Sequence, residues 1–186
     1  MKIQNVAVIG AGPLGRRLAA LISGAGFDMV LEDVLPSNLR TAADYLTGDD
    51  PKVQVQRGNL RFASSVEDAV RTADLIVDCV PDELESKLEI FSLLDRMAPP
   101  LAIFVTPTQS LSIADLASCT YRADRCIATQ FDSKDLHPGE RVVLFSTTRT
   151  SSEVLDGVMK FWTSLGFPTE LKLDPAESRV AAGTLF

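Results

Sequence analysis

A strand, a glycine-rich turn and a helix follow one another near the start of the chain, and this order constrains the fold more than any other feature. The apolar residues 6–9 predict a buried strand, residues 10–15 form the turn Gly-Ala-Gly-Pro-Leu-Gly, and residues 16–23 predict a helix. A second apolar run, residues 29–31, is followed by Asp33. Three glycines at this spacing between a strand and a helix, with an acid about twenty residues later, are typical of a dinucleotide-binding unit.

Each residue of the turn has a physical role in such a unit. Gly10 permits a tight turn, Gly12 leaves room for a pyrophosphate, and Gly15 lets the helix pack closely on the strand. Pro13 suits the first helical turn, where its missing N–H would have no partner within the helix. The free N–H groups of the turn, that of Leu14 among them, and the positive end of the helix dipole would face the phosphates.

An acid at position 33 predicts which dinucleotide binds. Asp33 would accept hydrogen bonds from the ribose hydroxyls, and together with Glu32 it would repel a 2′-phosphate. The sequence therefore predicts NAD as the cofactor in preference to NADP. The alternative is a glycine turn within an α/β fold that binds no ligand.

Composition excludes several other classes of protein. The net charge of −7 and the pI near 4.7 argue against a nucleic-acid surface, which needs clustered Lys and Arg. The start of the chain lacks a basic region with a long apolar run, and no apolar segment approaches about twenty residues, so we expect a cytoplasmic chain without a membrane span. Three cysteines follow neither a disulfide pattern nor a metal spacing, so we expect reduced thiols and no metal site.

Strands and helices alternate along the rest of the chain. This alternation predicts a single α/β domain, a Rossmann-type doubly wound and mainly parallel sheet, over residues 1–174, with a short tail at 175–186. Residues 53–58 are compatible with an edge strand or an irregular connection. The tail is compatible with a helix that has nothing to pack on, or with a frayed end.

The strand ends predict where a ligand would bind. In such a sheet ligands bind at the carboxyl ends of the strands, which brings together the glycine turn, the segment Val80-Pro81-Asp82 and a polar loop over residues 106–110.

Between Asp82 and that polar loop, residues 83–97 predict a helix with one apolar core stripe. The residues of this stripe are Leu84, Leu88, Phe91, Leu94 and Met97.

The motifs together resemble the cofactor-binding domain of the 3-hydroxyacyl-CoA dehydrogenases. The resemblance rests on the glycine turn and on residues 74–82, 87–91, 93–95, 98–100 and 110–117. It implies an oxidoreductase of fatty acid metabolism with NAD as cofactor and an acyl substrate. It also matches Asp82 and Lys87 to contacts with the nicotinamide half of NAD, and Gln109 is counted with these contacts; from the residues alone, Lys87 could equally be a solvated helix residue.

The chain departs from the family where proton transfer takes place. The family has a histidine at the end of the strand that corresponds to residues 125–131, and a glutamate further on that holds it. Here Gln130 occupies the histidine's place, Val142 or Val143 stands near the glutamate's place, and Gln109 lies in the preceding loop. An amide cannot act as a general base near neutral pH. The catalytic residues are therefore unassigned, with Gln109, Gln130 and Ser133 as the positions that face the expected site.

Two functions remain open. One is an NAD-dependent oxidoreductase on a 3-hydroxyacyl or small hydroxy-acid substrate, with an altered base such as His137 beside Glu140, although a histidine before Pro-Gly is usually a solvated turn residue. The other is an NAD(H)-binding or assembly module without dehydrogenase activity. The family's helical domain has no counterpart before Phe186, so we expect a homodimer or a partner subunit to cover the faces it would occupy.

Overall fold

One sheet organises the molecule. The computed structural model describes residues 1–47, 58–133 and 136–177, and within these residues eight strands form a single sheet in the order β3-β2-β1-β4-β5-β6-β7-β8. Neighbouring strands are parallel except β6 and β7, which are antiparallel. The strands are β1 (Asn5–Ile9), β2 (Asp28–Glu32), β3 (Leu60–Ala63), β4 (Leu75–Asp78), β5 (Ile103–Pro107), β6 (Cys126–Phe131), β7 (Val142–Ser146) and β8 (Thr169–Leu173).

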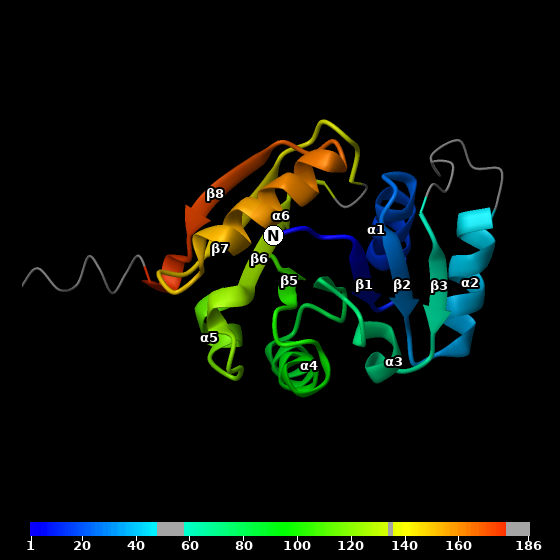
Figure 1. Cartoon of the computed structure of the whole chain (residues 1–186), viewed down its shortest axis with the longest axis horizontal. Helices are drawn as coiled ribbons and strands as arrows, with labels where there is room; N and C mark the ends of the chain where they lie inside the picture. Colours follow the sequence, from blue (N-terminus) through cyan, green and yellow to red (C-terminus); the bar gives the residue numbers. More distant parts are fainter. Residues whose placement is uncertain (48–57, 134–135, 178–186) are drawn as a thin grey trace, which may run out of the picture.

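Helices cover both faces of this sheet (Figure 1). One apolar core lies between the sheet and α1, α2 and α6, and a second lies between the sheet and α3, α4 and α5. The helices are α1 (Pro13–Gly24), α2 (Pro36–Thr47), α3 (Val66–Val70), α4 (Leu84–Met97), α5 (Ile113–Ala117) and α6 (Ser152–Ser164), with a short 3-10 turn, η1, at Ala123–Arg125. The Rossmann-type, mainly parallel single domain predicted from the sequence is confirmed.

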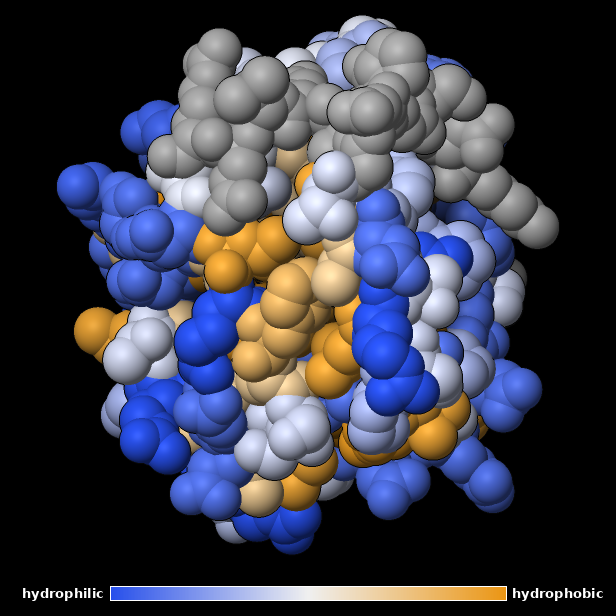
Figure 2. Space-filling view, turned by 90° about the vertical axis from the view of Figure 1, so that its right-hand side faces the viewer, coloured by the Kyte–Doolittle hydropathy of each residue, from blue (hydrophilic) through white to orange (hydrophobic). Residues whose placement is uncertain are grey.

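The strand sequences explain the two-sided core. All four residues of β4 and all five of β5 are buried, as expected for parallel strands covered on both faces. Serine side chains cap two of the helices, since the hydroxyls of Ser65 and Ser151 accept hydrogen bonds from Asp68 N and Val154 N at the starts of α3 and α6. On the side where β3 and α2 lie, Figure 2 shows an apolar area framed by hydrophilic side chains.

The predicted core stripe of α4 is partly wrong. Leu84, the first residue of the helix, is 48% exposed, and Met97, the last, is 38% exposed, so the apolar stripe is buried only in the middle of the helix. Lys87, in contrast, is completely buried together with Ile90, Phe91 and Leu94. The interpretation of Lys87 as a solvated residue is therefore wrong as well.

One further boundary differs from the sequence prediction. Strand β5 continues through Thr106 to Pro107, because these residues pair with Ala128 and Thr129 of β6, so the polar loop begins at Thr108. Asp174, the last residue before the expected tail, is 1% exposed, and its carboxylate accepts hydrogen bonds at the start of α5. The undecided segment 53–58 lies almost entirely outside the described residues, as do residues 178–186 of the tail.

Candidate cofactor site

The three glycines of the turn are required for different reasons. Gly10 has a φ of 99°, and a Cβ on it would lie 2.9 Å from the carbonyl oxygen of Cys79. A Cβ on Gly15 would lie 1.8 Å from the carbonyl oxygen of Gly10, so the close packing of α1 on β1 excludes any side chain there. Gly12 has an ordinary φ of −65°, and a Cβ on it would meet nothing within 4 Å. The fold therefore explains why glycine is needed at positions 10 and 15. At position 12 the lack of a side chain instead keeps open the space in front of the helix.

Around Gly12 the start of α1 is arranged as the sequence predicts. Gly12 is the N-cap residue, Pro13 is the first residue of the helix, and Arg16 N donates to Gly12 O over 3.0 Å. No side chain caps this helix start. Leu14 packs its side chain against the core on the α1 side, so only its backbone is available to a ligand. The first turn of α1 thus presents N–H groups and the positive end of its dipole to the open space.

Asp33 links the glycine turn to the segment that follows β2. Its Oδ2 accepts hydrogen bonds from Ala11 N over 2.9 Å and from Asn38 Nδ2 over 3.0 Å, and its Oδ1 accepts one from Leu35 N over 2.8 Å. The carboxylate is nearly buried but lines the cavity next to the turn. An ionised carboxylate offers about four acceptor positions, so Asp33 keeps capacity for a ligand hydroxyl.

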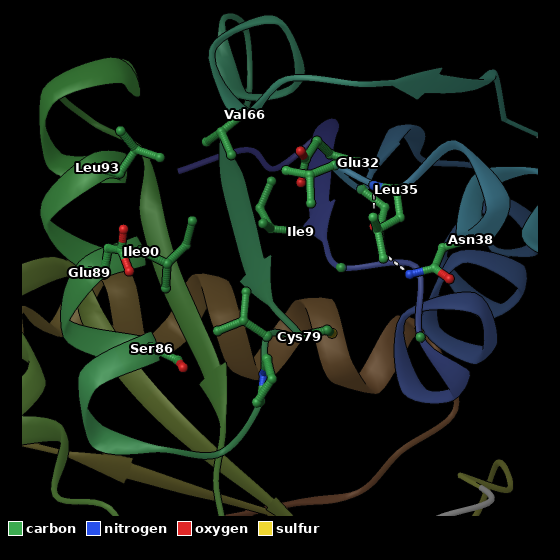
Figure 3. Close-up of a pocket in the computed structure, with 16 residues that line it drawn as sticks. Ile9, Glu32, Leu35, Asn38, Val66, Cys79, Ser86, Glu89, Ile90 and Leu93 are labelled. Carbon is green, nitrogen blue, oxygen red and sulfur yellow. Dashed lines mark hydrogen bonds between the residues drawn. The ribbon is translucent and has the colours of Figure 1, made fainter.

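The cavity beside Asp33 has a volume of about 650 Å³. It lies between the ends of β1, β2 and β4 on one side and α3 and α4 on the other, with side chains from each of these elements around it (Figure 3). Its walls are mainly apolar, and polar groups come from the strand ends and from one face of α4. The lining residues are Ile9, Gly10, Gly12, Glu32, Asp33, Val34, Leu35, Asn38, Val66, Cys79, Val80, Pro81, Ser86, Glu89, Ile90 and Leu93.

Glu32 is an unusual residue in this wall. Its side chain is 2% exposed, and its Oε1 is buried without a hydrogen-bond partner among the residues that the structure describes. Burial, and to a smaller extent the neighbouring Asp33 carboxylate, raises the pKa of Glu32 to about 7. Nearby, burial and then the charge of Asp78 raise the pKa of the Cys79 thiol far above its ordinary value, so this thiol stays protonated near neutral pH.

Lys87 does not lie where the family resemblance places it. Its ammonium is completely buried and donates to Asp78 Oδ2 over 3.0 Å and to Thr106 Oγ1 over 2.9 Å. Asp78 Oδ1 also accepts from Val80 N over 2.9 Å. The predicted direct contact between Lys87 and a cofactor is thus wrong for this structure, because the ammonium lies beneath the ligand edge and connects the ends of β4 and β5 with α4.

The predicted loops meet at this edge of the sheet. Gln109 N donates to Asp82 Oδ2 over 2.8 Å, which joins the loop after β5 to the start of α4. Gln130 Nε2 lies 3.3 Å from Gln109 Oε1 and 3.4 Å from Gln109 O. Gln109 and Gln130 are therefore neighbours, and their amides interact with each other.

A second cavity of about 500 Å³ lies beside these two glutamines. Its described lining contains no histidine, and its ionisable groups are Asp115 and Asp174, the second of which is used by the start of α5. The lining residues are Leu84, Thr108, Gln109, Ser110, Leu111, Ser112, Asp115, Gln130, Phe145, Asp174, Pro175 and Ala176.

Ser133 and His137 lie elsewhere. Neither residue lines either cavity. His137 is exposed in a turn where its N–H donates to Glu140 Oε2 over 3.2 Å. Leu136, immediately before it, is buried and accepts from Arg17 on α1, which ties this turn to the opposite face of the sheet from the second cavity. The structure therefore gives no support to His137 as a base oriented into the site.

Two features of the site were missed from the sequence. Glu32 was interpreted only as a charge near the ribose, and Thr106 was placed in a loop rather than in the buried group with Asp78 and Lys87. The alternation of β2 carried a signal for the first feature, since Glu32 lies two residues after Val30 and so faces the same side of the sheet. The positions of acids and lysines in the sequence gave no signal for the second feature, the buried contact of Thr106 with Asp78 and Lys87.

None of the helices in the described ranges combines the length and apolar character that crossing a membrane requires. Within the same ranges, no three His, Cys, Asp or Glu side chains are grouped so that they could hold a metal ion.

Comparisons with known proteins agree with this site. Residues 5–169 match the family described as "3-hydroxyacyl-CoA dehydrogenase, NAD binding domain". The chain is 28% identical over 180 residues to the mitochondrial hydroxyacyl-coenzyme A dehydrogenase of Sus scrofa, covering 88% of this chain and 57% of that protein. It is 32% identical over 139 residues to the 3-hydroxybutyryl-CoA dehydrogenase of Bradyrhizobium diazoefficiens, covering 69% and 47% respectively.

A solved structure described as a diketoreductase with dual catalysis of dicarbonyl compounds superposes with a TM-score of 0.81 at 27% identity, covering 92% of this chain and 65% of that one. The chain thus spans only about half to two thirds of the length of these relatives. The matched region contains the glycine turn, the larger cavity and most of the lining of the second cavity; Asp174, Pro175 and Ala176 of that lining lie after it. By fold, site and sequence, the chain belongs to the NAD-binding domain family of the 3-hydroxyacyl-CoA dehydrogenases.

Proposed function

We propose that this chain binds NAD(H) at the edge of the sheet formed by the glycine turn and the larger cavity. The observation that carries the proposal is Gly12. No atom of the described residues lies within 4 Å of a Cβ built on Gly12, and its backbone conformation does not require glycine. A pyrophosphate in that space would receive the N–H groups at the start of α1.

The neighbouring groups fit the rest of the cofactor. Asp33 would accept a ribose hydroxyl, and the apolar walls of the larger cavity would hold the adenine ring. On the other side of the turn, Val80, Pro81, Asp82 and Gln109 would face the nicotinamide half. The carboxylates of Glu32 and Asp33 would repel a 2′-phosphate, which favours NAD over NADP.

For catalysis, we propose that the chain alone transfers hydride poorly or not at all. The second cavity, beside Gln109 and Gln130, would be the space in which a substrate meets the nicotinamide. An oxidoreductase on a hydroxyacyl or hydroxy-acid substrate is the activity that the relatives' names suggest. However, Gln130 and Gln109 pair through amides that cannot take up the hydroxyl proton, and general-base catalysis typically contributes on the order of 10² to 10⁴ in rate. Cytoplasmic location and self-association stay predictions from the sequence.

Titration with NADH, followed by its fluorescence, tests the binding proposal. The wild-type chain should bind NADH more tightly than NADPH, and Gly12→Leu should abolish binding while leaving thermal unfolding unchanged. Gly15→Ala is the matched control, because its Cβ would clash with Gly10 O and should lower stability. Wild-type affinity for NADH in Gly12→Leu would contradict the proposal.

Oxidation of NADH with acetoacetyl-CoA, and with a small panel of 3-keto acids, tests the catalytic part. We expect NADH binding without turnover. Turnover at rates typical of enzymes, about 1 to 10³ s⁻¹, would show that another group supplies the base.

A further inference from the structure

The carboxyl group of Glu32 lacks a partner in a place where a ligand can supply one. Oε1 is buried without a hydrogen bond, although buried polar atoms in folded proteins are nearly always paired. The residue lines the larger cavity from the end of β2, near Ile9 of the neighbouring strand β1 (Figure 3). An unpaired buried acceptor is unfavourable unless a donor reaches it in the functional state.

Among the described residues around the cavity, no donor forms a hydrogen bond with Oε1. Asn38 donates to Asp33 instead, and neither the Ser86 hydroxyl nor the Cys79 thiol of the lining is paired with Oε1. The other ionisable oxygen groups there are the carboxylates of Asp33 and Glu89, and the cavity lining includes no lysine or arginine. Arg61, on the neighbouring strand β3, is paired with Asp68 of α3. Asp33, immediately after Glu32, accepts three hydrogen bonds from the protein. The missing hydrogen bond is therefore specific to Glu32 and is not shared by both acids at this strand end.

The walls around Glu32 suit a flat apolar ring. Ile9, Val66, Ile90 and Leu93 approach the cavity from β1, α3 and α4 (Figure 3). If the cofactor's ribose lies at Asp33, the attached base enters this space. Adenine has two apolar faces and an exocyclic amino group, which is an N–H donor at the ring edge.

We propose that Glu32 accepts a hydrogen bond from the exocyclic amino group of adenine and thereby selects an adenine nucleotide. This inference rests on the proposed binding of NAD(H) and adds the residue that recognises the base. Because the side chain is 2% exposed, the contact requires a rotation of the carboxyl into the cavity that the residue lines. Both charge states keep an acceptor oxygen, so the contact does not depend on whether Glu32 is ionised.

Calorimetric titration with two nucleotides tests the inference. The probes are 5′-AMP and purine riboside 5′-monophosphate, which differ only in the exocyclic amino group. In the wild-type chain, AMP should bind about tenfold more tightly, the effect of one hydrogen bond to a buried acceptor. In Glu32→Leu, which removes the acceptor, the ratio of the two affinities should fall to about one.

Two variants make the result specific. Glu32→Gln keeps a carbonyl acceptor and should keep most of the preference for AMP. Glu67→Leu makes the same substitution at an exposed position of α3 outside the cavity lining and should keep all of it. An equal preference for AMP in Glu32→Leu and wild type would overturn the inference.

The same titrations separate this inference from the function on which it rests. If Glu32→Leu only gains affinity for NADPH, with the preference for AMP unchanged, Glu32 is a charge barrier and the inference is wrong. If AMP shows the predicted dependence on Glu32 but NADH does not bind, the proposed NAD(H) binding is wrong and adenine recognition stands. If the wild-type chain binds AMP and its amino-free analogue equally, adenine recognition is wrong even when NADH binds.

Discussion

Replacing Lys87 by methionine should destabilise the fold strongly, because it leaves a buried charge without its partner. Asp78 is 1% exposed, and its Oδ2 would keep only the Thr106 hydroxyl as a donor. Breaking a buried ion pair from one side typically costs about 3–5 kcal/mol, a large part of the 5–15 kcal/mol that stabilises an ordinary domain. Changing Asp78→Leu together with Lys87→Met should recover much of this loss, since a matched apolar pair leaves no buried charge.

The pH dependence gives this prediction a second check. Burial already raises the pKa of Asp78, with Lys87 opposing the rise, so loss of Lys87 should raise that pKa further. A carboxyl whose pKa is higher in the folded state stabilises the fold at low pH, and that contribution is lost as the pH rises through the folded pKa. The cost of Lys87→Met should therefore be larger at pH 8 than at pH 5.

Urea unfolding followed by the fluorescence of Trp162 provides the assay. Trp162 is the only tryptophan of the chain and is completely buried, so its emission should report unfolding directly. Arg61→Met is the matched control, because Arg61 and Asp68 form an ion pair with both side chains about half exposed, and it should cost at most about 1 kcal/mol. A loss below 1 kcal/mol in Lys87→Met, or an equal loss at both pH values, would refute the reasoning.

Two other predictions concern single acids. Burial raises the pKa of Glu32 from 4.5 to about 7, a difference worth roughly 3 kcal/mol. Between pH 4 and pH 9 the free energy of unfolding of the wild-type chain should therefore fall by about that amount relative to Glu32→Gln. Parallel stability curves, measured by urea unfolding across that range, would show that the carboxyl is not desolvated. Asp174→Ala should lower the free energy of unfolding by about 1–3 kcal/mol, because Asp174 Oδ2 accepts a hydrogen bond from Ile113 N over 2.6 Å at the start of α5. Asp174→Asn should cost less. An unchanged urea midpoint in Asp174→Ala would contradict this role.

The parts of the fold that sequence could predict depend on local patterns. Strands β1 and β2 and helix α1 lie where the apolar runs and the glycine turn predict them, although α1 starts at Pro13 rather than at residue 16, because apolar runs and glycines act over a few residues. The approach of Gln109 to Gln130 was also predictable, since parallel strands bring their carboxyl ends to one edge.

The parts that could not be predicted depend on contacts between distant elements. A lysine on a helix is usually solvated, and Lys87 is buried only because Asp78 and Thr106, from two different strands, meet it. Likewise, the isolation of the Glu32 carboxyl depends on how α3 and α4 close over the end of β2, which no pattern within β2 specifies.

The hydrogen bonds of Asp33 have a consequence for how cofactor preference could evolve. The acid that would discriminate between NAD and NADP also holds the glycine turn through Ala11 N and the following segment through Leu35 N and Asn38. A single substitution at Asp33 would therefore change the shape of the phosphate loop together with the choice of ribose. The exposed neighbour Val34, in contrast, is a position where a basic residue could be introduced without replacing the acid that makes these hydrogen bonds.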